Sequence, residues 1–208
     1  MPTQDLTFAI VGSGGDGVVT TGDFIAQAGA REGLHCMKVE AYGPQIRGGE
    51  SSCTVRVSAN PIFAQGDLVD VMVAFNWGDF ARFRGEIIAS PNAVVLYEEA
   101  DKTSREEVEP HLGTADGSRW IAVPFTELAK ESAGTTLAKN IVTLGVLCEL
   151  FGLPKEGLLK AIETKFSKKK AAVLEANLKG FQAGIEWAAE HKGEVGDKKL
   201  QYIPADPM

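Results

Sequence analysis

A short apolar stretch followed at once by a glycine-rich loop is the feature that most constrains the fold of this chain. The apolar stretch, which predicts a buried strand, consists of Phe8, Ala9, Ile10 and Val11. The loop that follows it consists of Gly12, Ser13, Gly14, Gly15, Asp16 and Gly17. Small and apolar residues then recur at helical spacing from Val18 to Gly29, and Gly33 stands at a typical helix stop. Because the first amides of a helix lack intrahelical partners, this turn predicts an anion site.

The pattern of strands and helices predicts an α/β fold with a mainly parallel central sheet, helices on its faces and a helical C-terminal third. The strand–helix–strand order at the start is the unit of a parallel sheet. Further strands are expected at residues 35–40, 53–58 (half-buried by its alternation), 69–75, 93–97 and 120–124. Residues 102–119 are polar and predict a surface excursion. Helices are expected from Thr126, from residue 138 to about Gly152, after Pro154 and over residues 173–188.

Length and composition limit the class of protein. The 208 residues, of which 44% are hydrophobic and 24% charged, suit one substantial soluble domain. We expect residues 1–191 to form it, and the polar, turn-rich residues 192–208 to form an extended tail that a partner surface receives. The net charge of -7 argues against nucleic-acid binding. No stretch resembles a signal peptide or a membrane span, so the expected location is cytoplasmic.

Residue types that usually carry chemistry are scattered along the chain. The cysteines lack the C-x-x-C spacing of an iron–sulfur or zinc site; they are Cys36, Cys53 and Cys148. The histidines form no pair that suggests a metal site or a catalytic base; they are His35, His111 and His191. We therefore predict no metal ligands and no catalytic residue. The chain is expected to bind, close or assemble rather than to catalyse alone.

A second glycine-rich loop follows the expected strand at residues 35–40. It consists of Tyr42, Gly43, Pro44, Gln45, Ile46, Arg47, Gly48 and Gly49. The planar guanidinium of Arg47 suits a carboxylate or a phosphate. It suits equally an ion pair between two subunits, or plain solvation.

The glycine loop on its own has rival interpretations. Its spacing Gly12-x-Gly14-x-x-Gly17 matches a dinucleotide fingerprint, and Glu40 stands where a ribose-binding acid would. Asp16 argues against this, because a carboxylate beside a pyrophosphate is unfavourable unless it turns away to cap helix amides. A nicotinamide-dependent oxidoreductase, a free-standing nucleotide- or coenzyme-binding Rossmann-like protein and glycines that serve only tight packing therefore remain open.

Three ordered motifs together resemble the gamma subunit, or gamma domain, of the 2-oxoacid:acceptor (ferredoxin) oxidoreductases. They are the glycine loop through Val18, the segment from Tyr42 to Ser51, and the segment from Ala138 to Gly145. Enzymes of that family use thiamine diphosphate and iron–sulfur clusters to convert a 2-oxoacid and coenzyme A to acyl-CoA and carbon dioxide.

The resemblance implies a division of labour between chains. Thiamine diphosphate and magnesium would lie between alpha and beta partners, and the clusters in a beta or ferredoxin-like subunit, with NAD reduced through a flavoprotein subunit as an alternative acceptor route. This chain would hold no cofactor, be inactive alone, cover the coenzyme A site and help to assemble the complex. Residues 12–18 would lie toward coenzyme A, while Tyr42, Arg47, Gly48 and Gly49 would lie at a subunit junction beside the access path.

Overall fold

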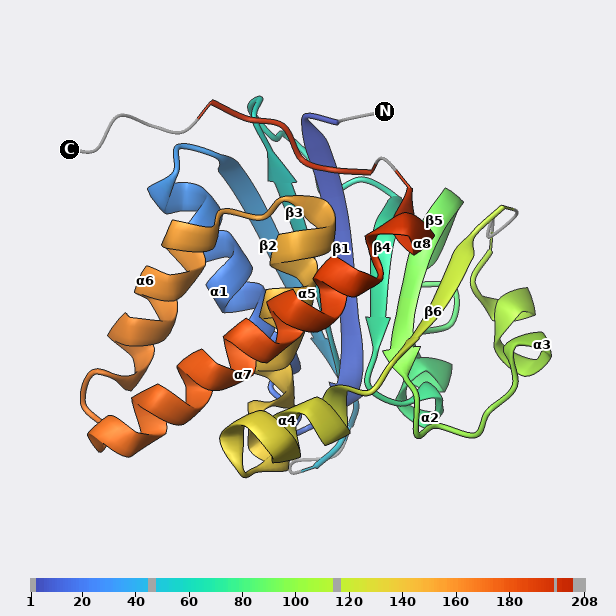
Figure 1. Cartoon of the computed structure of the whole chain (residues 1–208). Coiled ribbons are helices and arrows are strands. Elements are labelled where there is room, and N and C mark those ends of the chain that lie inside the picture. The colour runs from blue at the N-terminus through green and yellow to red at the C-terminus, as the bar shows by residue number, and fades with distance from the viewer. Residues whose placement is uncertain (1–2, 45–47, 114–116, 197, 204–208) are drawn as a thin grey trace.

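The computed structural model describes residues 3–44, 48–113, 117–196 and 198–203, which form one six-stranded sheet with helices on both faces (Figure 1). The strands are β1 (Asp5–Ser13), β2 (His35–Tyr42), β3 (Glu50–Ser58), β4 (Leu68–Ala74), β5 (Ile88–Glu98) and β6 (Arg119–Val123). Their order across the sheet is β2-β3-β1-β4-β5-β6. Strands β1, β4, β5 and β6 pair in parallel, whereas β3 is antiparallel to both β1 and β2. The mainly parallel α/β sheet expected from the sequence is confirmed.

The position of β3 corrects two expectations. Strand β2 does not pair with β1, because β3 is inserted between them, so the initial strand–helix–strand unit spans a gap of one strand. The prediction that β3 is half-buried is wrong as well. Thr54 is only 9% exposed, since it lies between Ala9 of β1 and Val39 of β2 in the middle of the ladder. Two of the alternating polar residues, Thr54 and Ser58, are small and lie buried inside the sheet, whereas Arg56 is only partly buried.

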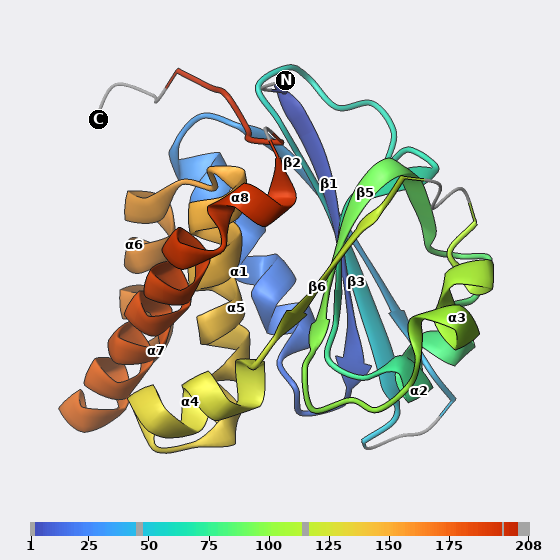
Figure 2. The ribbon, with the colours of Figure 1, turned by 45° about the vertical axis from the view of Figure 1, so that its right-hand side comes forward.

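One face of the sheet carries more helices than the other. They are α1 (Val18–Arg31), α2 (Trp77–Phe80), α3 (Arg105–Val108), α4 (Phe125–Ala133), α5 (Lys139–Phe151), α6 (Lys155–Phe166), α7 (Ala171–Glu190) and α8 (Lys192–Val195). Figure 2 shows α2 and α3 on one face and the remaining helices on the other. The sequence predicts residues 102–119 to lie on the surface, but the described part at residues 102–113 buries Val108 and Leu112 in the smaller of the two hydrophobic cores. This segment is therefore a cover for the second face of the sheet.

Helix α5 lies at the centre of the larger core and packs closely against α7. A methyl group on Gly145 would overlap the carbonyl oxygen of Phe181, and one on Gly184 would overlap that of Val142. The two helices thus meet backbone to backbone. Gly152, with φ of 74°, ends α5 in the left-handed conformation that the sequence predicts for a glycine there.

The C-terminal segment differs from the extended tail that the sequence predicts. After α8, where Val195 is 1% exposed, the chain runs back along the amino end of β1. Leu200 forms a parallel bridge with Thr3 and is 5% exposed. Its amide donates to the carbonyl of Phe151 at 2.8 Å. Residues 198–203 therefore pack on the chain itself, and residues 204–208 of the predicted tail lie outside the described residues.

Candidate functional site

The connections that follow the two adjacent parallel strands β1 and β4 lead to opposite faces of the sheet. Helix α1, which follows β1, lies on one face of the sheet, and α2, which follows β4, lies on the other (Figure 2). Ligands of open α/β sheets bind outside the carboxyl ends of the strands at such a switch point. The glycine loop begins at the carboxyl end of β1, which is this switch point. The topology and the sequence therefore indicate the same segment as a binding site.

Three of the four glycines in the first loop have distinct structural reasons. Gly14 donates its amide proton to the carbonyl of Gly49 at 2.8 Å, and a Cβ on Gly14 would lie 3.2 Å from the Cα of Gly48. Gly17 has φ of 80° and faces Asn140, whose Cβ would be 2.8 Å from an added methyl group. Gly15 has φ of 108° with open space before it. Gly14 and Gly17 permit close packing, and Gly15 permits a backbone turn at the cavity wall.

A cavity of about 440 Å³ opens between the glycine loop, the start of α1 and the second loop. Its lining from the first loop consists of Ser13, Gly14, Gly15, Gly17 and Val18. Its lining from the second loop includes Tyr42, Gly48 and Gly49. Described residues of both predicted loops thus line one cavity. Of the described members of the first loop, Gly12 and Asp16 stay out of the lining, and Arg47 lies outside the described residues.

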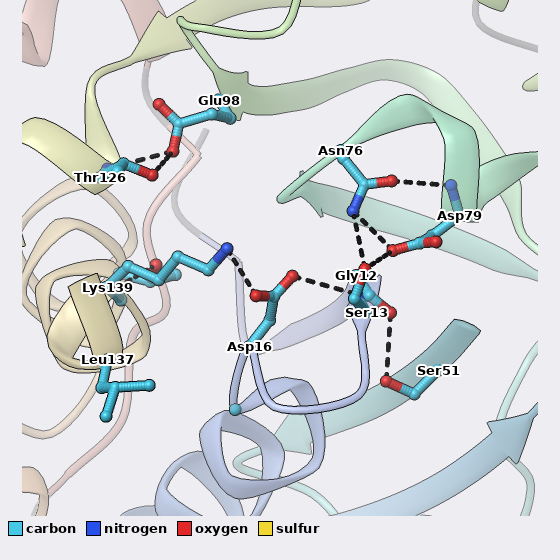
Figure 3. Close-up of polar contacts among 12 residues, drawn as sticks. Gly12, Ser13, Asp16, Ser51, Asn76, Asp79, Glu98, Thr126, Leu137 and Lys139 are labelled. Carbon is cyan, nitrogen blue, oxygen red and sulfur yellow. Dashed lines mark hydrogen bonds and ion pairs between the residues drawn. The ribbon is translucent and has the colours of Figure 1, made fainter. Parts of the chain in front are cut away.

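The Asp16 side chain is turned back into its own loop (Figure 3). Its Oδ2 accepts from the amide of Ser13 at 3.0 Å, and its Oδ1 lies 2.7 Å from the Nζ of Lys139 at the start of α5. The carboxylate is thus turned away from the cavity, which the sequence pattern makes a condition for an anion beside it, although it binds Ser13 and Lys139 instead of capping the amides of α1. Lys139 belongs to the third motif of the sequence, but nothing in the pattern gave it a role.

A polar bridge joins the ends of β1 and β4 (Figure 3). Ser13 Oγ donates to Asp79 Oδ2 at 2.6 Å, while the amide of Asp79 donates to Asn76 Oδ1 at 2.7 Å and so caps α2. The hydroxyl of Ser13 therefore has a structural role, because it links the end of β1 to α2. Sequence reasoning missed both Asn76 and Asp79, although their spacing of three is that of a helix N-cap motif.

Two acidic residues near the cavity differ in their surroundings. Glu50 Oε2 is buried beside Gly43 and has no hydrogen-bond partner among the described residues. Glu40 instead bonds Lys38 and the hydroxyl of Tyr42, and the hydrogen bond from Lys38 lowers the pKa of that carboxyl below its usual value. Glu40 also lies two strands from β1, because β3 intervenes. A ribose-binding acid stands on the strand next to β1 in a dinucleotide fold, so the geometry argues against that interpretation.

Residues 7–187 match the sequence family described as pyruvate ferredoxin/flavodoxin oxidoreductase. The chain belongs to this family. The curated relatives of the family include ketoisovalerate oxidoreductase subunit VorA of Methanothermobacter marburgensis, which is 37% identical over 90% of this chain. This chain covers only 37% of that relative's length. The 2-oxoglutarate synthase subunit KorC of Methanothermobacter thermautotrophicus is 30% identical, with 87% of this chain and 94% of the relative covered.

Solved structures place the fold in the same family. The gamma subunit of keto/oxoacid ferredoxin oxidoreductase from Geobacter sulfurreducens aligns with a TM-score of 0.71 and 25% identity, over 90% of this chain and 98% of that one. The 2-oxoglutarate:ferredoxin oxidoreductase from Magnetococcus marinus, with 2-oxoglutarate, coenzyme A and succinyl-CoA bound, aligns with a TM-score of 0.80 and 31% identity. That alignment covers 99% of this chain and 34% of that one. The resemblance to gamma subunits and gamma domains is thereby confirmed.

Proposed function

We propose that the chain is the gamma-type subunit of a complex that decarboxylates a 2-oxoacid oxidatively, with coenzyme A, to acyl-CoA and carbon dioxide. Its role in that complex is to cover the coenzyme A site and to help hold the subunits together. The observation that carries the proposal is the cavity at the start of α1, which joins the two glycine-rich loops.

The start of α1 supplies the chemistry for an anionic ligand. Val18, Val19 and Thr20 line the cavity, and the amides of a first helical turn have no intrahelical acceptor. None of the described side chains caps this end of α1, and its first turn contains no acidic residue. A helix N-terminus carries about half a positive charge, which favours a phosphate group. The diphosphate of coenzyme A is therefore the part that we place here.

The two sides of the cavity differ in the ligand groups that they suit. The α1 side offers amide donors, whereas Glu50, the first residue of β3, offers a buried carboxylate oxygen that has no donor among the described residues. Coenzyme A carries both kinds of group, since its diphosphate accepts hydrogen bonds and its pantetheine arm has two amide donors. The Magnetococcus marinus enzyme, to which this chain is 31% identical, has coenzyme A bound. Both points support coenzyme A as the ligand.

The remaining groups of the reaction belong, in this proposal, to other subunits. Within the described ranges no three His, Cys, Asp or Glu side chains converge as metal ligands. We assign thiamine diphosphate, magnesium and the iron–sulfur clusters to alpha, beta and ferredoxin-like partners, with a flavoprotein as a further possible subunit. We place Tyr42, which is 60% exposed, at the subunit junction with Gly48 and Gly49, and we assign Arg47, which lies outside the described residues, to the same junction. The isolated chain should therefore show no turnover.

Substituting Gly15 tests the coenzyme site. Its φ of 108° strains any side chain, and an added methyl group would enter open space at the cavity wall. In the reconstituted complex, Gly15→Ala should raise the KM for coenzyme A roughly tenfold, the equivalent of about 1.4 kcal/mol, and leave that for the 2-oxoacid unchanged. Gly85→Ala is the matched control, because Gly85 also has a positive φ of 77° and open space but lies outside the cavity. A change in the KM of the 2-oxoacid alone would contradict the assignment.

A further inference from the structure

One carboxylate lies within the glycine loop, and it is paired with a lysine. Asp16 and Lys139 are joined at 2.7 Å, with side chains only 20% and 15% exposed. Asp16 also accepts the amide proton of Ser13, which keeps that amide within the loop (Figure 3). Gly15 and Gly17, on either side of Asp16, line the cavity. A charged side chain thus stands directly behind the backbone that faces the ligand.

The position of Lys139 is not explained by the helix that carries it. Lys139 is the first residue of α5, where the helix dipole disfavours a cation. Its ammonium lies 4.8 Å from the centre of the Phe75 ring, a modest cation–π contact. The next residue, Asn140, packs against Gly17. The start of α5 therefore supports the glycine loop at two successive residues, and the Asp16 carboxylate is the strongest partner of Lys139 within the described part of the chain.

The charge balance of this pair affects an anionic ligand. Without Lys139, Asp16 would place an uncompensated negative charge one residue from the amides that face the cavity. Repulsion between like charges a few ångströms apart near a protein surface is large enough to change a dissociation constant by about 10- to 100-fold. With Lys139 in place the pair has no net charge. The amides at the start of α1 then determine the electrostatic potential in the cavity.

We propose that Lys139 is a positioning residue of the coenzyme site, which acts through Asp16 by neutralising its charge and holding the glycine loop in its ligand-binding form. This inference rests on the proposed function, since it takes the diphosphate of coenzyme A as the ligand. Its specific content is that Lys139 supports the anionic part of the coenzyme and not the pantetheine arm.

The test compares two ligands and three variants in the reconstituted complex. Lys139→Met should raise the dissociation constant of coenzyme A by about 10- to 100-fold and leave that of pantetheine, which lacks the diphosphate, within about twofold. Asp16→Asn keeps an oxygen for the Ser13 amide and removes the charge. Adding it to Lys139→Met should therefore restore most of the affinity. Lys179→Met is the control, because Lys179 forms an exposed pair with Glu175 on α7.

Two results would overturn the inference. Equal weakening of coenzyme A and pantetheine by Lys139→Met would show general damage to the fold, and absence of rescue by Asp16→Asn would show that Asp16 is not the intermediary. If the wild-type complex binds coenzyme A elsewhere, the proposed function is wrong, and thermal unfolding of the full chain then decides the remaining claim. Positioning by the pair requires that the effects of Asp16→Asn and Lys139→Met on the melting temperature are not additive. Additive effects would refute it.

Discussion

Replacing Gly184 by alanine should destabilise the chain, whereas the same replacement at Gly180, one turn earlier on α7, should stabilise it. A methyl group on Gly184 would overlap the carbonyl oxygen of Val142 and lie 3.0 Å from the amide nitrogen of Val146. At Gly180 the nearest atoms to an added methyl group are side-chain carbons, at 3.7 Å and beyond, which is ordinary contact. The two sites thus share a helix and a substitution but differ in what the new group meets.

The magnitudes follow from two opposing terms. Alanine is favoured over glycine inside a helix by about 1 kcal/mol, and this gain applies at both positions. Overpacking costs about 1–3 kcal/mol or more, and it applies only at Gly184. We take the upper part of that range, about 2–3 kcal/mol, because the neighbour there is backbone that cannot rotate away. The expected net changes in the free energy of unfolding are a loss of about 1–2 kcal/mol for Gly184→Ala and a gain of up to about 1 kcal/mol for Gly180→Ala.

Thermal unfolding followed by circular dichroism measures the difference directly. For a chain of this size 1 kcal/mol corresponds to about 2–4 °C, so the two variants should melt about 5–10 °C apart, on opposite sides of the wild type. Urea unfolding provides a second estimate with the same expected order. If Gly184→Ala melts at or above the temperature of the wild type, the close approach of α5 and α7 does not limit the packing, and the reasoning fails.

Two further predictions concern the thiols and the C-terminal segment. Burial raises the pKa of Cys36 to about 11 and those of Cys53 and Cys148 to about 12, so iodoacetamide at pH 8.5 should leave the intact mass of the folded chain unchanged until urea is added. Because unfolded thiols ionise near pH 9 and the folded ones stay protonated, the free energy of unfolding should fall as the pH rises from about 9 toward 12, which urea titrations at several pH values would reveal. Leu200→Ala should cost about 2–3 kcal/mol in urea unfolding, whereas Ile203→Ala, at a side chain 92% exposed, should change it by less than about 0.5 kcal/mol. Equal effects would mean that the segment does not pack as described.

Local patterns predicted the elements well where one face of each element decides its place. The apolar spacing after Val18 gave α1, and Gly152 and Pro154 marked the boundary between α5 and α6. The order of the strands could not be predicted in the same way, because the insertion of β3 between β2 and β1 depends on long-range pairings such as that of Asp5 with Ser58. A strand in which polar and apolar residues alternate, such as β3, looks half-exposed in the sequence whether or not neighbours cover it.

The candidate site was predictable in its backbone and not in its side-chain partners. Glycines at fixed spacing after a strand are visible in a sequence, and the cavity joins the two loops that they form. The partner of Asp16 was not visible, since Lys139 lies more than a hundred residues away and reaches the loop only because α5 packs on the sheet. Leu200 was missed for a related reason. A single leucine in a polar segment gives no periodicity, yet it fills a site between Thr3 and Phe151.

The bridge between Thr3 and Leu200 pairs the first described segment of the chain with the last. The amide of Thr3 donates to Lys199 and that of Gln201 donates back to Thr3, so the first and last described segments lie side by side at the amino end of β1 (Figure 1). The glycine loop stands at the opposite end of that nine-residue strand, about 30 Å away. A circular permutation that joins these segments and reopens the chain at the exposed turn around Phe63 would keep every strand pairing and leave the cavity untouched. The order of the strands along the chain can thus be changed without changing the architecture that holds the site.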